Sequence, residues 1–514
     1  MKNVSFLKQT QKTAVVIVLF SGFFALTVAV INPYPDIFVG WLSTFLLSSC
    51  TLALLYMTWL LISPCKTSGY AVSAALAARL IFAVFLFAAL PVWGHDKAPA
   101  NNGYLFLDAF RRDSDAWTLA QSGETLNTAF QNTFSTDQYG GLLALSAAVY
   151  RFSSPQAHRP LLIVLIGASV CTLGIPFLWD ATRKRWGENT ACWSVWLYAL
   201  YPESLVLGAS QMREPFLIGL SAIAFWSVMT WRENRTARTI SAVVSLMLCG
   251  AISLSAGTLM AAAFAVLFFF ENFYLQFNSL QKRISLLILA CVLIGGAFLG
   301  WGLLTDYASY DMYLMEAASG RVAYELENIG GFFKAPFIIA YGIAQPVLPA
   351  SIAYPGIPLA RGIAIFRSAG WYFLIPFLLF SLFMISRAEP RKDRILAIVL
   401  ASASFSWILL SSARAGGDQW DNPRYRAIFL IWQVVLAAWS IMQYQKTKSP
   451  WLSRIIFIET VFVVFFLQWY LSRYFDLFDR LFFWQMVLVI ITIAAFVLIG
   501  GWIADTLKQR RHKA

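Results

Sequence analysis

The residues best suited to chemistry are three carboxylates, Asp108, Asp113 and Asp115, in the polar segment 94–138 of an otherwise apolar chain. A pair of arginines stands among them, and apolar runs flank the segment on both sides. A carboxylate in such a place can take a proton from a hydroxyl group. Because this is the most polar long stretch of the chain, the sequence predicts that function is located here.

Asp113 is the candidate general base. Asp115 is either a second acid that orients an acceptor or, with Asp113, a ligand to a divalent cation. The alternative for both is structural, because acids at the start of a short surface helix interact favourably with its dipole. On such a helix Asp113 and Trp117 share a face. The three histidines are widely separated and the six cysteines lack CxxC spacing, so neither set predicts a zinc site.

Further ionisable residues stand where apolar runs begin. Arg213 and Glu214 open one such run, where an ionisable group is costly unless it has a partner or a role. Glu214 is therefore interpreted either as a catalytic acid, with Arg213 binding substrate, or as half of an Arg–Glu pair at the membrane interface.

Arg424 and Arg426 open a later apolar run and are candidate phosphate-binding residues, because a guanidinium group matches the geometry of phosphate oxygens. The alternative is that they anchor a helix at the interface with Trp420 and Tyr425. Weaker candidates of the same kind are Arg321, Lys334 and Arg361.

The composition restricts the fold class. Hydrophobic residues make up 59% of the 514 residues and charged residues 13%, and the mean hydropathy is +0.65. Apolar runs of about 20 residues, enough to cross about 30 Å of hydrocarbon, recur along the chain. They are too long for barrel strands and do not alternate with polar residues. The sequence therefore predicts an all-α polytopic transmembrane bundle with roughly 13–14 spans.

The expected spans follow the apolar runs. They are 13–31, 37–62, 70–93, 160–179, 190–210, 212–231, 237–255, 257–271, 286–304, 371–386, 394–411, 427–443, 453–472 and 484–503.

The net charge of +13 is distributed as in a membrane protein. Lysines and arginines cluster at both termini and in short loops between apolar runs, which is the positive-inside pattern. This pattern predicts cytoplasmic termini, outward-facing segments 94–138 and 305–369, a lipid bilayer as partner and no nucleic acid. The first apolar run lacks a small-residue cleavage site and is interpreted as a retained helix.

We expect an N-terminal three-span region (1–93), a catalytic module (94–271) and a C-terminal transmembrane region (272–514). The apolar stretch Leu142–Tyr150 is too short for a comfortable crossing and is predicted to lie in the interface or to dip partway into the membrane. Between Pro336 and Gly362, prolines and glycines interrupt an apolar stretch. This predicts a re-entrant or surface-lying element that lines a cavity.

The order of several motifs resembles that of the GT-C membrane glycosyltransferases. These motifs are Asp113-Ser114-Asp115-Ala116-Trp117-Thr118-Leu119-Ala120, Tyr139-Gly140-Gly141-Leu142, Arg185-Trp186-Gly187, Tyr201-Pro202 with Arg213-Glu214, and Asn422-Pro423-Arg424-Tyr425-Arg426. The resemblance covers 105–235 and extends beyond it only in outline. Trp117 replaces the usual aromatic hydroxyl, Gly140-Gly141 replaces a proline pair, and extra helices precede the catalytic loop.

The resemblance implies an inverting glycosyltransferase at the outer face of a bacterial inner membrane. It would move a sugar from a polyprenyl-phosphate carrier to a glycan, lipid or protein acceptor. Its catalytic residues would be Asp113, Asp115 and Glu214. Residues implied to bind substrate are Arg213, Tyr139, Arg424, Arg426, Arg321 and Lys334. A divalent cation, held by Asp113 and Asp115, is an option and no other cofactor is implied.

Three other functions stay open. A Wzy- or ligase-like glycan polymerase would use a lipid diphosphate donor, and it typically depends on outer arginines and a histidine, here His95. A transporter or flippase would be supported by two related halves with broken helices, and no internal repeat is visible. An assembly subunit with a degenerate site is the third alternative.

Overall fold

The computed structural model describes residues 2–32, 36–131, 140–292, 294–296 and 331–511. Within these ranges the chain forms helices and no strands. Eleven helices are long and apolar enough to cross a membrane, or up to 12 if one bent pair is a single span. The protein is therefore an all-α, multi-pass membrane protein, as the sequence predicts.

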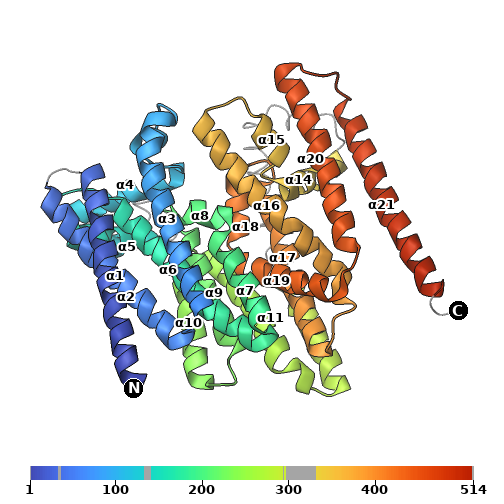
Figure 1. Cartoon of the computed structure of the whole chain (residues 1–514), viewed down its shortest axis with the longest axis horizontal. Helices are drawn as coiled ribbons and strands as arrows, with labels where there is room; N and C mark the ends of the chain where they lie inside the picture. Colours follow the sequence, from blue (N-terminus) through green and yellow to red (C-terminus); the bar gives the residue numbers. More distant parts are fainter. Residues whose placement is uncertain (1, 33–35, 132–139, 293, 297–330, 512–514) are drawn as a thin grey trace. The chain divides into compact units, whose positions relative to one another are not determined.

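The chain divides into two compact units, Met1–Ala265 and Val266–Ala514. The first unit, blue to green in Figure 1, contains two short 3-10 helices, η1 (Ala100–Asn102) and η2 (Leu126–Phe130). Its α-helices are α1 (Lys2–Ile31), α2 (Ile37–Ile62), α3 (Lys66–Trp93), α4 (Leu107–Gln121), α5 (Gly141–Ser153), α6 (Leu161–Trp186), α7 (Glu188–Leu200), α8 (Pro202–Gly208), α9 (Glu214–Met229), α10 (Arg235–Ile252) and the first part of α11 (Leu254–Asn272).

The core of the first unit is built around α6, the most deeply buried of the candidate spans. Small residues let its neighbours approach closely, as is common where membrane helices pack. Gly219 of α9 faces the backbone carbonyl of Val170 on α6, so that an added methyl group would overlap with that oxygen. Gly174 of α6 faces the hydroxyl of Tyr198 on α7 in the same way. Helices α7 and α9 are therefore held firmly against α6.

Two of the expected spans are shorter in the structure. The range 190–210 is divided between α7, of 13 residues, and α8, of 7 residues. The division falls at Tyr201-Pro202, because the residue before a proline is driven out of the helical conformation. Helix α9 has 16 residues and begins only at Glu214. These two shortened ranges, together with the bend between residues 427 and 430, account for the difference between the 14 expected spans and the 11 among the described residues.

Helix α5 packs beside the ends of neighbouring helices. Gln121, at the end of α4, donates to the carbonyl of Pro155 after α5 (2.8 Å). Asn32, at the end of α1, donates to the carbonyl of His158 before α6 (2.8 Å). The chain just after α5 therefore lies beside the ends of α4 and α1, and Gly141 at the start of α5 packs against the backbone of Ala251 at the end of α10. Its 13 residues make it a short helix, as expected, and its position relative to the membrane stays a prediction.

A fully buried arginine, Arg79, joins α3 to the break between α7 and α8. Its Nη1 donates to the carbonyls of Ala75 (3.0 Å) and Ala199 (3.3 Å), and its Nη2 donates to the hydroxyl of Ser204 (2.8 Å). The last carbonyls of a helix lack intrahelical partners and carry partial negative charge. Ala199 is one of these carbonyls at the end of α7, so the break supplies an acceptor for the buried cation.

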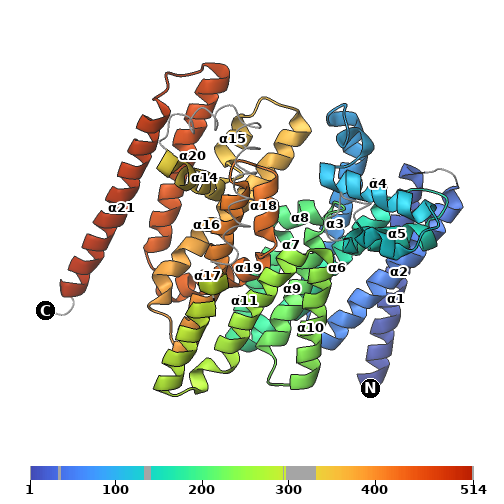
Figure 2. The ribbon, with the colours of Figure 1, turned by 180° about the vertical axis from the view of Figure 1, so that it is seen from behind.

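The second unit continues with the rest of α11 and the 3-10 helix η3 (Tyr274–Gln276). Its described α-helices are α14 (Gly331–Ala344), α15 (Leu348–Ala353), α16 (Pro358–Ile385), α17 (Arg391–Ala415), α18 (Asp421–Ala427), α19 (Leu430–Thr447), α20 (Trp451–Phe475) and α21 (Phe483–Arg511). Helices α18 and α19 meet at 73°. Helices α20 and α21 form an antiparallel pair (Figure 2), joined by a bidentate ion pair of Arg454 with Asp505 (2.7 and 2.9 Å).

The close approach of α6 and α9 makes a testable prediction. Replacing Gly219 by alanine should destabilise the protein by about 1–3 kcal/mol, because a methyl group would be forced against a backbone carbonyl that cannot move alone. Thermal unfolding of the purified protein in detergent measures the effect. The control is Gly22→Ala in α1, where nothing lies within 4 Å of the added carbon. An equal melting temperature for the two variants would contradict the packing.

Candidate active site

Asp113 lies in the middle of α4. The helix begins at Leu107, and the acid in its first turn is Asp108. The structural interpretation of Asp113 as an acid at a helix start is therefore wrong. The helix starts earlier because Phe106 and Ala109 are buried and fix the chain before the polar residues. The Asp113 side chain is itself buried (2% exposed), and a buried carboxylate is costly unless hydrogen bonds satisfy it.

Three side chains from three segments hydrogen-bond the Asp113 carboxylate. The Tyr150 hydroxyl of α5 donates to Oδ1 (2.6 Å). The Tyr104 hydroxyl, from the segment before α4, donates to Oδ2 (2.6 Å). His158, from the segment between α5 and α6, places Nε2 2.8 Å from the same oxygen. These lengths are typical of charge-assisted hydrogen bonds, so the carboxylate is the centre of a fixed polar cluster.

Aromatic rings hold His158 in place. Trp117, one turn after Asp113 on α4, stacks on the imidazole with ring centroids 5.3 Å apart and planes at 20°. Tyr150 meets the imidazole edge to face at 5.0 Å, and Trp117 meets Tyr150 at 5.7 Å. The prediction that Asp113 and Trp117 share a face is therefore confirmed. Packing on two sides and a hydrogen bond on a third leave the imidazole little rotational freedom.

His158 is the most accessible member of the cluster. Its side chain is 29% exposed, whereas the side chains of Tyr104 and Tyr150 are buried. An ionised carboxylate only accepts hydrogen bonds, so in the neutral imidazole Nε2 carries the proton and Nδ1 has the free lone pair. An aspartate that fixes the tautomer and orientation of a histidine is the arrangement that general bases use. The Nδ1 atom is thus chemically suited to accept a proton from a ligand.

Sequence reasoning missed His158. The residue lies 45 positions after Asp113 in a short polar connection, and no motif surrounds it. The same holds for Tyr104 and Tyr150, which are ordinary aromatic residues near apolar helices in the sequence. Only the fold of α4 against α5, which pack closely together, brings them to one carboxylate.

Tyr104 is affected by its position beside Asp113. Burial, the negative charge of Asp113 and the hydrogen bond to it together raise the pKa of Tyr104 far above its ordinary value. The hydroxyl therefore stays protonated and remains a donor to the carboxylate at every physiological pH. Tyr104 is therefore a hydrogen-bond donor to Asp113 and does not itself exchange a proton.

Asp115 does not join the cluster. It lies two residues after Asp113 on the same helix, and side chains at that spacing point away from one another. A cation shared by Asp113 and Asp115 is therefore not supported by the geometry of α4. Across the described residues, no three histidine, cysteine, aspartate or glutamate side chains converge as metal ligands.

Glu214 and Arg213 lie at the beginning of α9, close to the segment that α4 contacts. The Glu214 side chain is fully buried, and its Oε1 is 3.7 Å from Nε of Arg213. Arg112, next to Asp113, donates to the carbonyl of Gln211 (2.6 Å). The Arg213–Glu214 pair that the structural interpretation expects is therefore present. The hydrogen bond of Arg112 connects α4 to the turn that precedes α9.

Arg424 and Arg426 belong to α18 of the second unit. Arg426 is 1% exposed, lies over the ring of Trp371 (3.5 Å) and donates to the carbonyl of Gln345 (2.8 Å). Arg424 is buried as well, with Nη1 3.3 Å from Asp421. Both guanidinium groups are held inside the protein by aromatic rings, backbone carbonyls or acids. Their assignment as phosphate-binding residues stays a prediction.

The remaining candidates are dispersed. Tyr139 and Arg321 lie outside the described residues. Lys334 is partly buried on α14, and Arg361 is exposed near the start of α16. The structure therefore gathers Asp113 with Tyr104, Tyr150 and His158, and it does not bring the second-unit candidates into one cluster.

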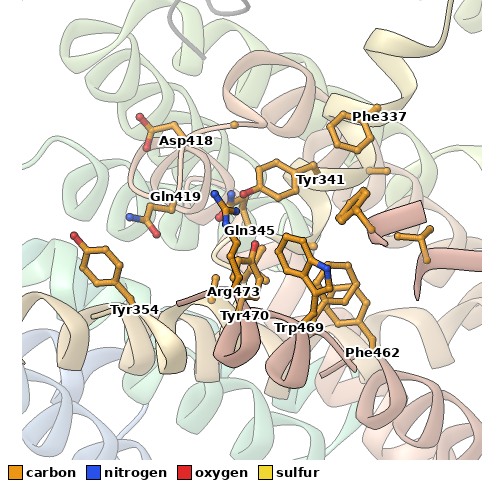
Figure 3. Close-up of a pocket in the computed structure, with 18 of the residues that line it drawn as sticks. Phe337, Tyr341, Gln345, Tyr354, Asp418, Gln419, Phe462, Trp469, Tyr470 and Arg473 are labelled. Atoms are coloured by element: carbon orange, nitrogen blue, oxygen red, sulfur yellow. The ribbon is translucent and has the colours of Figure 1, made fainter. Parts of the chain in front are cut away.

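The second unit contains a cavity of about 750 Å³ (Figure 3). Phe337 and Tyr341 of α14, Gln345, and Tyr354 after α15 form part of its wall. The prediction that the stretch between Pro336 and Gly362 lines a cavity is confirmed. Most of the remaining wall comes from α20 and α21 and from the connection between α17 and α18.

Comparisons with protein-family models, with curated proteins and with solved structures find no match for this chain. What the protein does must therefore be inferred from the chemistry of the Asp113 cluster and of the cavity.

The second prediction concerns the Tyr104 hydroxyl. Tyr104→Phe should lower the stability by about 1.5–3 kcal/mol near neutral pH, because a hydrogen bond to a charged group is lost. The folded pKa of Tyr104 is raised, so this contribution is complete below the unfolded pKa of about 10 and is lost as the pH rises above it. Thermal unfolding of both proteins from pH 7 upward measures the difference. A stability difference between the two proteins that increases above pH 10 would contradict the raised pKa of Tyr104.

Proposed function

We propose that this protein is a glycosyltransferase that moves a sugar from a polyprenyl-phosphate carrier to a hydroxyl acceptor. The observation that carries the proposal is the contact between the buried Asp113 carboxylate of α4 and the partly exposed imidazole of His158 before α6 (2.8 Å). We place the reaction on the side of a bacterial inner membrane opposite the N-terminus, where α4 and α5 lie. This would be the outer face if both termini are cytoplasmic.

The transfer requires a proton acceptor. In the proposed step the acceptor oxygen forms a bond to the anomeric carbon, and the bond from that carbon to the carrier phosphate breaks. The carrier leaves as its phosphate, and the proton of the acceptor hydroxyl goes to Nδ1 of His158. A positioned base of this kind contributes about 10²–10⁴-fold to the rate. Inversion at the anomeric carbon follows from the direct displacement.

Within this proposal Asp113 is a positioning residue. Both of its oxygens already accept hydrogen bonds from protein side chains, so neither is the first choice for a substrate proton. Its negative charge stabilises the imidazolium that forms when His158 takes the proton. In this proposal the general base is His158, and not Asp113 as expected from the sequence.

The motif order supports the choice of reaction. The segment with Asp113 joins two candidate spans, α3 and α6, and carries two short helices between them, which is compatible with the resemblance to the GT-C enzymes. A lipid diphosphate donor, as in a Wzy- or ligase-like polymerase, and transport without chemistry are the competing outcomes of the experiment that follows.

The third prediction concerns His158. His158→Ala should lower turnover of a polyprenyl-phosphate sugar by about 10²–10⁴-fold, because the proton acceptor is lost. Added imidazole should restore part of the activity. Asp113→Asn should also lower turnover, because the imidazole loses the carboxylate that fixes its tautomer and orientation. Release of the carrier phosphate from purified full-length protein is the measurement.

Matched controls come from the same polar segment. His95→Ala and Asp96→Asn change exposed residues of the same types outside the cluster and should keep wild-type turnover. Full activity of a folded His158→Ala protein would overturn the assignment of the base. Turnover of diphosphate donors alone would favour the polymerase, and no turnover of any donor by folded wild type would favour a transporter or an assembly subunit.

A further inference from the structure

The cavity of the second unit has a polar side and an apolar side. Asp418, Gln419 and Tyr354 lie along one side, and Arg473 and Gln345 lie near the middle (Figure 3). The opposite side is aromatic; Figure 3 labels Phe337, Trp469 and Phe462 there. A cavity divided in this way matches a ligand with a polar head and an apolar body.

Arg473 and Asp418 are the charged residues among those that line the cavity. In the described part of the chain neither forms an ion pair, with the other or with a third group. The Arg473 guanidinium is flanked by Trp469 (5.6 Å) and Tyr474 (5.9 Å). Asp418 uses Oδ1 to accept from the backbone N–H groups of Trp420 (2.6 Å) and Asp421 (2.9 Å), which leaves Oδ2 available.

Two opposite charges that face one cavity without pairing suit a ligand that carries both complementary charges. A phosphodiester bears one negative charge and matches the single guanidinium, whose planar donors fit phosphate oxygens. A primary ammonium group matches the remaining carboxylate oxygen. A head group with a higher negative charge would meet Asp418 as a like charge and would lack a second cation.

The apolar wall belongs to helices that face lipid. Helices α20 and α21 have only 22% and 11% of their most apolar windows buried within the protein. They contribute Phe462, Phe466 and Trp484 to the cavity. Hydrocarbon chains can therefore lie along the aromatic side and continue into the bilayer, while the head group stays on the polar side.

We propose that this cavity binds one zwitterionic aminophospholipid of the surrounding bilayer, with its phosphate on Arg473 and its ammonium group on Asp418. This site lies in the second unit and is independent of the proposed transfer reaction in the first. Its ligand is a membrane lipid of the phosphatidylethanolamine type.

The experiment measures lipid retention. Full-length protein is purified, delipidated and incubated in detergent with phosphatidylethanolamine or phosphatidylglycerol of identical chains, and bound lipid is counted by native mass spectrometry. Wild type should prefer phosphatidylethanolamine by about fivefold, the effect of one charge contact near a surface. Arg473→Gln should lower retention of both lipids by about fivefold. Asp418→Asn should abolish the preference and keep the phosphatidylglycerol level, because asparagine still offers Oδ1 to the backbone.

Arg480→Gln is the matched control, since Arg480 is an exposed arginine in the connection between α20 and α21 that does not line the cavity. It should retain both lipids as wild type does. Equal retention of the two lipids by wild type would overturn the ammonium assignment. Unchanged retention in a folded Arg473→Gln protein, or equal displacement by inorganic phosphate alone, would overturn the lipid site. Neither result depends on glycosyltransferase activity.

Discussion

A carboxylate buried at the boundary of a membrane protein must be satisfied by hydrogen bonds, and around Asp113 this requirement organises the polar part of the first unit. The donors come from three segments, before α4, within α5 and just before α6. Each segment is fixed in turn by backbone contacts to its neighbours, such as the bond from Asn32 to the His158 carbonyl. If α4 or α5 shifted, a desolvated negative charge would lose a partner, which costs far more than an ordinary contact.

The same requirement explains why α4 and α5 are short and lie at one side of the spans. Helix α4 is amphipathic: Ala116 and Leu119 are buried against α5, while Arg111 and Thr118 are exposed. A helix with such a face is stable at the membrane surface, where one side meets protein and the other meets water. Asp113 lies on the buried face, so α4 can expose its polar side while the carboxylate stays buried.

The fold class could be predicted from the sequence because the length and uniform apolarity of the runs leave few alternatives to membrane helices. That Asp113 and Trp117 share a face could be predicted from helix periodicity. The helix start could not, because it depends on tertiary burial of Phe106 and Ala109. His158 could not be predicted either, since its role comes from a contact across 45 residues and leaves no mark on the local pattern.

Asp113 and Asp418 show how the same residue type takes different roles. Asp113 is surrounded by the Tyr104 and Tyr150 hydroxyls and the imidazole of His158, which contact both of its oxygens. Asp418 is exposed among the residues that line a cavity, and one of its oxygens accepts from the backbone at the start of α18. The number of hydrogen bonds that a carboxylate already accepts therefore decides whether it positions a neighbouring side chain or is available to a ligand.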